Sequence, residues 1–138
     1  IVRRGLISTP GDPKLINSLC YALLRAGRVA EAEEAFKNYS HGDEDQKVYY
    51  LATQGLLEFK KGNFTAGRSL YSESIKLCKQ RKEKDLVGKA SLNLALAELE
   101  ASTKQASSAV QIAMSVSEGA SQPDNILLRK EILNMMQK

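Results

Sequence analysis

The chain has 138 residues, a length typical of one domain, and 43% of them are hydrophobic, which is enough apolar material for a buried core. Charged residues make up 26% of the chain and the net charge is +4, so the composition excludes a disordered chain, which needs fewer apolar residues and a larger charge imbalance. A surplus of four positive charges favours encounters with acidic partners but does not by itself indicate nucleic-acid binding.

The first predicted elements form a helical hairpin. A run of turn formers from Ser8 to Pro13 ends in an Asp-Pro pair suited to begin a helix. Apolar side chains then recur at helical spacing up to Gly27, and a second helix follows from Ala30 to about Asn38. Two helices joined by a short turn predict an αα-hairpin over residues 13–42. Residues 1–12 are interpreted as a tail or the end of a truncated upstream helix, because the chain starts without a Met.

The same layout is expected twice more. A helix over residues 45–61 and its partner over 65–80 form the second predicted hairpin, 45–80. Helices over residues 86–101 and 106–116 form the third, 82–118. The helices around residue 82 are expected to be longer here, with the extra turn accommodated at the charged run that begins at Lys79.

A last helix is predicted after a break. Residues 119–123 contain Gly and Pro, and an apolar helical segment follows over 124–136. A stack of hairpins leaves one apolar side of its last member bare, so this segment, 121–138, is interpreted as a capping helix. In total the sequence predicts an all-α fold of about seven helices.

The hairpins repeat at a fixed distance along the chain. Three pairs of matching residues are each separated by 35 positions: Gly27 and Gly62, Ala32 and Gly67, Phe36 and Tyr71. A period between 33 and 47 residues indicates a helical solenoid. The glycines suit helix ends, the small residues suit a close approach of helices, and the aromatic residues suit the space between hairpins.

These residues resemble the tetratricopeptide repeat (TPR) family, whose unit has a Gly at its turn and small and aromatic residues in its second helix. The resemblance covers residues 13–116. Gly55 falls in the family's small slot, whereas the family's early Trp or Tyr is replaced and the terminal Pro is missing. The resemblance implies a right-handed α–α superhelix, with a concave groove, formed by the first helices, that binds a peptide or helix of a partner.

Helix geometry assigns side chains to this groove, on the face of each first helix opposite its own partner. These candidate groove residues, mostly apolar or aromatic with a few amides, are Asn17, Tyr21, Leu24, Tyr49, Thr53, Leu56, Phe59, Lys89 and Asn93. Exposed apolar surface of this kind favours the apolar face of a partner helix or an extended segment with hydrophobic anchors. Members of the family that clamp a terminal carboxylate need basic and amide groups at the groove positions. Only Lys89 matches outright, so a receptor for the terminal carboxylate of a partner is not expected.

The sequence contains no motif that is typical of a catalytic site. The single histidine, His41, lies in a Ser-His-Gly-Asp turn without a nucleophile motif, and the acidic residues after it are typical of a helix start. Phosphate-binding, metalloprotease and hydrolase signatures are missing, so no enzyme activity, cofactor or metal is expected. Cys20 and Cys78 lie in apolar segments outside any CxxC pattern, which favours free buried thiols in a reducing, cytoplasmic compartment.

The sequence therefore predicts a protein-interaction module, a TPR scaffold within a larger protein. A domain that senses a small ligand or signal peptide is the alternative, and an RNA-binding helical repeat is a weaker one. The basic cluster Lys76, Lys79, Arg81, Lys82 and Lys84 is interleaved with Glu83 and Asp85, as is typical of a solvated helix end. Nucleic acid and membrane are not the expected partners, and the exposed ends of the stack could support a homo-oligomer.

Overall fold

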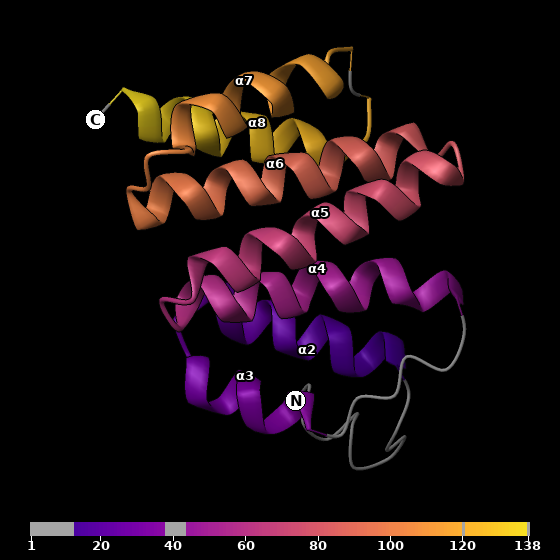
Figure 1. The fold of residues 1–138 in the computed structure, drawn as a ribbon, viewed down its shortest axis with the longest axis vertical. Coiled ribbons are helices and arrows are strands. Elements are labelled where there is room, and N and C mark those ends of the chain that lie inside the picture. Colours follow the sequence, from indigo (N-terminus) through magenta and orange to yellow (C-terminus); the bar gives the residue numbers. More distant parts are fainter. Residues whose placement is uncertain (1–12, 38–43, 120, 138) are drawn as a thin grey trace. The chain divides into compact units, whose positions relative to one another are not determined.

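The computed structural model describes residues 13–37, 44–119 and 121–137, and within these ranges it is helical without any strand (Figure 1). The described helices are α2 (Pro13–Arg25), α3 (Val29–Phe36), α4 (Glu44–Lys60), α5 (Phe64–Gln80), α6 (Lys84–Ala101), α7 (Ala106–Val116) and α8 (Pro123–Met136). This confirms the all-α prediction. The expected tail 1–12 and the turn with His41 lie outside the described residues.

The chain divides into two compact units, residues 1–70 and 71–138, and the division falls inside α5. It therefore cuts the hairpin that the sequence predicts for residues 45–80. In the first unit, α2 packs against both α3 and α4. The apolar side of α2 is buried at helical spacing through Ile16, Cys20 and Leu24, and the Cys20 thiol donates to the backbone oxygen of Ala32 at 3.7 Å. Ala32 is therefore at a close helix contact, as expected for a small residue.

In the first unit α4 and the start of α5 approach each other closely at Gly67. A Cβ atom added at this glycine would lie 2.6 Å from Cδ2 of Phe59 and 2.8 Å from the backbone oxygen of Gly55. Real Cβ atoms do not approach other atoms this closely, so only glycine fits here without a shift. Gly67 therefore has a packing role that depends on its missing side chain.

The second unit has a comparable arrangement, with α6 packed against both α7 and α8. Its buried hydrophobic cluster draws on all three helices and consists of Leu92, Ala95, Leu96, Val110, Ala113, Leu128 and Ile132. The last helix, predicted as a cap, therefore supplies part of this core.

Four turns between helices share one hydrogen-bonding pattern. In each, the residue with positive φ donates to the carbonyl three residues back, and the next residue donates to the carbonyl five residues back. This is the Schellman pattern, which satisfies the last carbonyls of a helix. The residues with positive φ are Gly27 (80°), Gly62 (87°), Lys82 (58°) and Ser102 (55°). The sequence predicts the first two; the other two lack a glycine.

The charged run after Lys79 does not take up extra length. α5 continues to Gln80 and α6 begins at Lys84, so this turn is as short as the others. The added residues lie within long helices, as expected around residue 82, because α5 has 17 residues and α6 has 18.

Glycine at the two non-glycine turns is expected to stabilise the fold. Replacing Ser102 or Lys82 by glycine removes the cost of a left-handed conformation, about 1–2 kcal/mol, while the higher entropy of glycine in the unfolded chain costs a smaller amount. We expect each change to raise the free energy of unfolding by about 0.5–1 kcal/mol, measured by urea denaturation. Gly27→Ala, which imposes the opposite change in an open turn, is the matched control and should destabilise. A loss of stability in Ser102→Gly would contradict this reading of the turn.

Candidate functional site

Four of the nine candidate groove residues belong to the core. Leu24 is fully buried, and Thr53, Leu56 and Phe59 are each at least 95% buried. The ring of Phe59 lies 5.7 Å from that of Phe64, centroid to centroid. These four side chains are therefore not surface residues, in contrast to the expected exposed lining.

The remaining candidates of the first unit are half-buried and lie on the packed pair of helices α2 and α4. Asn17 and Tyr21 are one helical turn apart on α2, and Tyr49 is on α4. The side-chain oxygen of Asn17 is buried and accepts no hydrogen bond. A buried acceptor without a donor costs about 1–3 kcal/mol.

The candidate groove residues of the second unit, Lys89 and Asn93, bond to other residues of the same unit. The ammonium of Lys89 pairs with the carboxylate of Asp124 at the start of α8, at 3.2 Å, and Asn93 donates to the backbone oxygen of Lys89 at 3.0 Å. Leu92 and Leu96, on the same helix, are in the core with Ile132 of α8. The last helix thus packs along this part of α6.

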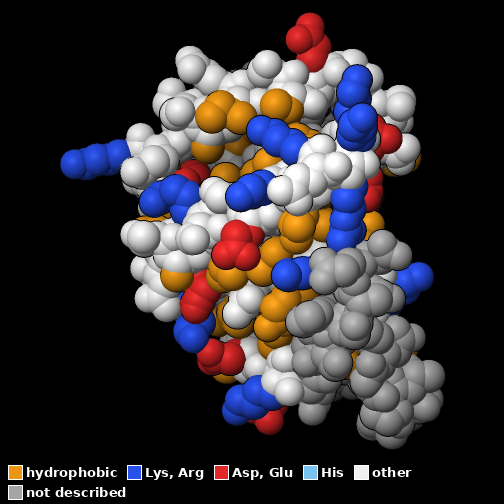
Figure 2. Space-filling model, turned by 45° about the vertical axis from the view of Figure 1, so that its right-hand side comes forward, with side chains coloured by type: hydrophobic (Ala, Val, Ile, Leu, Met, Phe, Trp, Pro, Cys, Tyr) orange, Lys and Arg blue, Asp and Glu red, His pale blue; other side chains and the backbone are white. Residues whose placement is uncertain are grey.

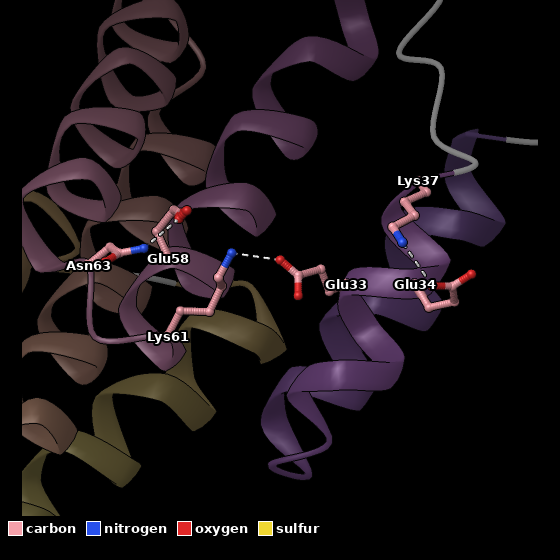
Figure 3. A network of polar contacts seen from close by, with 6 residues as sticks. All are labelled: Glu33, Glu34, Lys37, Glu58, Lys61 and Asn63. Atoms are coloured by element: carbon pink, nitrogen blue, oxygen red, sulfur yellow. Dashed lines mark hydrogen bonds and ion pairs between the residues drawn. The ribbon is translucent and has the colours of Figure 1, made fainter.

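A polar network at the surface of the first unit joins α3 to the end of α4 (Figure 3). Lys61 donates to Glu33 at 2.6 Å, and Asn63 donates to Glu58 at 3.4 Å. The hydrogen bond from Lys61 lowers the pKa of the Glu33 carboxyl, and the same bond raises the pKa of Lys61. Both side chains are partly exposed, and such pairs contribute little to stability.

A second polar cluster, which sequence reasoning missed, lies where α6, α7 and α8 meet. Asn125 is 98% buried and donates to the backbone oxygen of Asp85 at 3.1 Å, while its own side-chain oxygen accepts no hydrogen bond. Arg129 donates to the hydroxyl of Ser117 at 2.6 Å and to the backbone oxygen of Met114 at 3.0 Å. These bonds tie α8 to α6 and α7. Single Asn, Arg and Ser residues form no recognisable motif in the sequence, so this cluster could not be predicted from it.

The exposed hydrophobic side chains are on the second unit and not on the predicted groove. Within the described part of the chain, the large hydrophobic residues that are exposed are Ile112, Val116, Ile126, Leu127, Leu133 and Met136. Figure 2 shows hydrophobic side chains (orange) at the surface in the upper part of the view, which contains α6 to α8. Ile112 and Val116 are on α7, and the other four residues are on α8.

Both cysteines are free and buried. Burial raises the pKa of the Cys20 thiol to about 11 and that of the Cys78 thiol to about 11, with Glu83 acting in the same direction on Cys78. At neutral pH both therefore remain protonated thiols, which are neither nucleophiles nor metal ligands.

Groups of acidic, histidine and cysteine side chains that could hold a metal ion do not occur among the described residues. Within the same ranges, none of the helices combines the length and the apolar character that a bilayer crossing requires. The basic cluster lies at the end of α5 and in the turn before α6, and Asp85 beside it accepts from Gln122 at 3.4 Å.

Comparison of the chain with models of known families, with curated proteins and with solved structures finds no match.

Proposed function

We propose that this chain is a protein-interaction module, a cytoplasmic scaffold of the TPR type with the right-handed superhelical arrangement of that family, and that it binds a helix or peptide of a partner. The binding surface is the groove between α2 and α4, around Asn17, Tyr21 and Tyr49. The observation that carries the proposal is that these three side chains are half-buried on two helices that pack against each other.

The chemistry around Asn17 supports a peptide ligand. Tyr21 lies one turn further along α2, so its ring and the Asn17 amide share one face of the helix. An extended peptide or a helix offers apolar side chains that aromatic rings on such a face can bind. The hairpin repeat also supports this proposal, because solenoids present extended concave surfaces to their partners.

Selection of peptides from a displayed library, followed by fluorescence anisotropy with the selected peptides, tests the groove. Tyr21→Ala and Tyr49→Ala are expected to weaken binding about tenfold each, as truncation of a binding tyrosine does. Tyr50→Ala is the matched control, because Tyr50 follows Tyr49 on α4 but its ring lies 5.3 Å from that of Phe36, centroid to centroid. Equal affinity of the wild type and all three variants would remove the groove from the proposal.

A further inference from the structure

Four lysines cluster where α5 ends and α6 begins. Lys76 and Lys79 lie one turn apart near the end of α5, Lys82 is in the turn, and Lys84 is the first residue of α6. The turn is tight, because the backbone N–H of Lys82 donates to the backbone oxygen of Lys79 at 3.0 Å. All four side chains are exposed, and none of them forms an ion pair with another described residue. We call these four residues the turn lysines.

The charged residues that alternate with the turn lysines have other neighbours. Arg81 and Glu83 are half-buried. The pKa of the buried Cys78 thiol is raised by burial and in addition by Glu83, while Arg81 lowers it, so both charged groups lie near this thiol. Asp85 accepts a hydrogen bond from Gln122, before α8, at 3.4 Å. The two acids that follow lysines in the sequence therefore do not neutralise the turn lysines by ion pairing.

This arrangement is unfavourable for the stability of the fold. Like charges one turn apart on a helix, as at Lys76 and Lys79, repel one another. Lys82 has a φ of 58°, a left-handed conformation that favours glycine, and two of the four turns with the same hydrogen bonds have glycine at this position, namely Gly27 and Gly62. Positions at which local preferences are violated are candidates for function. Binding of an anionic partner therefore explains the turn lysines better than folding does.

The size of the cluster indicates which anionic partner it fits. One helical turn and one tight turn span on the order of 10 Å, which matches three or four residues of an extended chain at about 3.3 Å each. Duplex nucleic acid is bound by many phosphate contacts along its backbone, and single strands require aromatic side chains for stacking, which the segment 76–84 lacks. The segment also has no large exposed hydrophobic residue that could anchor it in a membrane.

We propose that the turn lysines bind a short acidic segment of a partner protein, a run of about four Asp or Glu residues in an extended conformation. Since the lysines are exposed, their ammonium groups can pair with carboxylates without any opening of the fold. This surface is on the second unit, so it can bind whether or not the α2–α4 groove holds a peptide. Solvent-exposed ion pairs are individually weak, so the complex is expected to be weak and sensitive to salt.

Titration of isotope-labelled protein with a hexaglutamate peptide, followed by NMR at low salt, tests this proposal. Signals of residues 76–84 are expected to shift, with an affinity that falls as salt is added. The double variant Lys76→Gln with Lys79→Gln should weaken binding about fivefold. Lys104→Gln with Lys130→Gln removes two exposed lysines elsewhere in the same unit and should change the affinity by less than about twofold. Unshifted signals over 76–84, or equal weakening by both double variants, overturns the proposal.

Lys82→Gly separates binding from stability. Like Ser102→Gly, it is expected to stabilise the fold, because both changes remove a left-handed conformation from a residue other than glycine. Only Lys82→Gly also removes a turn lysine, so it should weaken hexaglutamate binding about twofold to fivefold, while Ser102→Gly leaves the affinity unchanged. Equal affinities of these two variants would contradict a role of the turn lysines in binding.

Two further probes distinguish the other classes of anionic partner. A hexathymidylate and vesicles that contain anionic lipid are titrated at the same salt concentration as hexaglutamate. We expect both to bind more weakly than hexaglutamate, for the lack of stacking side chains and of apolar anchors. Tighter binding of either probe that is lost in Lys76→Gln with Lys79→Gln would assign the turn lysines to nucleic acid or to a membrane surface, and would overturn the acidic segment.

Discussion

Gly67→Ala is expected to lower the free energy of unfolding by about 1–3 kcal/mol. At an open helical position the same change would raise stability by about 1 kcal/mol, because alanine has the higher helix propensity. Here the new methyl group would lie 2.6 Å from the Phe59 ring and 2.8 Å from the backbone oxygen of Gly55, and no change of rotamer moves a backbone oxygen. The helices must therefore separate. Urea denaturation followed by circular dichroism measures the change.

The loss of stability has two sources, the contact of the new methyl group with the Phe59 ring and its contact with the Gly55 backbone oxygen, and their contributions can be measured separately. Combining Gly67→Ala with Phe59→Leu removes the ring atoms nearest to the new methyl group, so part of the loss should be recovered in a double-mutant cycle. Ser69→Ala, at an exposed position of the same helix, is the control and should change stability by less than about 0.5 kcal/mol. A gain of stability in Gly67→Ala would mean that α4 and α5 are not in close contact at this position.

Ile132→Ala is expected to destabilise the protein by about 2–5 kcal/mol, the largest single effect that we anticipate. Ile132 is fully buried in the core of the second unit, where α8 meets α6 and α7. Truncation leaves a cavity in this small core, so a lower midpoint of thermal unfolding should accompany the loss. Thermal and urea unfolding followed by circular dichroism give both quantities.

The next residue supplies the matched control. Leu133 exposes 49% of its surface, so Leu133→Ala should cost less than about 1 kcal/mol when measured at low protein concentration. The conservative change Ile132→Val should cost about 0.5–1.5 kcal/mol, since it removes only one methylene group. Equal effects of Ile132→Ala and Leu133→Ala would contradict the assignment of α8 to the core.

The helices and their order could be predicted from the sequence because apolar spacing and glycine positions are local signals. Gly27 and Gly62 mark two helix ends correctly, and the predicted starts of α5, α7 and α8 lie within one residue of the observed ones. Lys82 and Ser102 adopt the same left-handed conformation, although neither residue type favours it. The hydrogen bonds of the turn hold them there, so the residue type does not predict the helix end.

The candidate site could be predicted only in part. Helical geometry correctly groups Asn17 with Tyr21 on one face of α2, but it does not reveal which faces other helices cover. Leu24 and Leu56 are therefore buried where an open groove was expected. In α8 apolar residues occupy several sides, and periodicity alone could not distinguish the buried Ile132 from the exposed Leu133. Burial depends on contacts between segments far apart in the chain, which a local pattern does not contain.

The short turns have a further consequence for how the chain folds. The main packing partners, α2 with α3 and α6 with α7, are neighbours in sequence and are joined by connections of three or four residues. Closing such short loops costs little chain entropy, and proteins with mainly local contacts have low contact order and fold quickly. Each hairpin can therefore form before distant segments meet, so this topology permits folding to begin in either half of the chain.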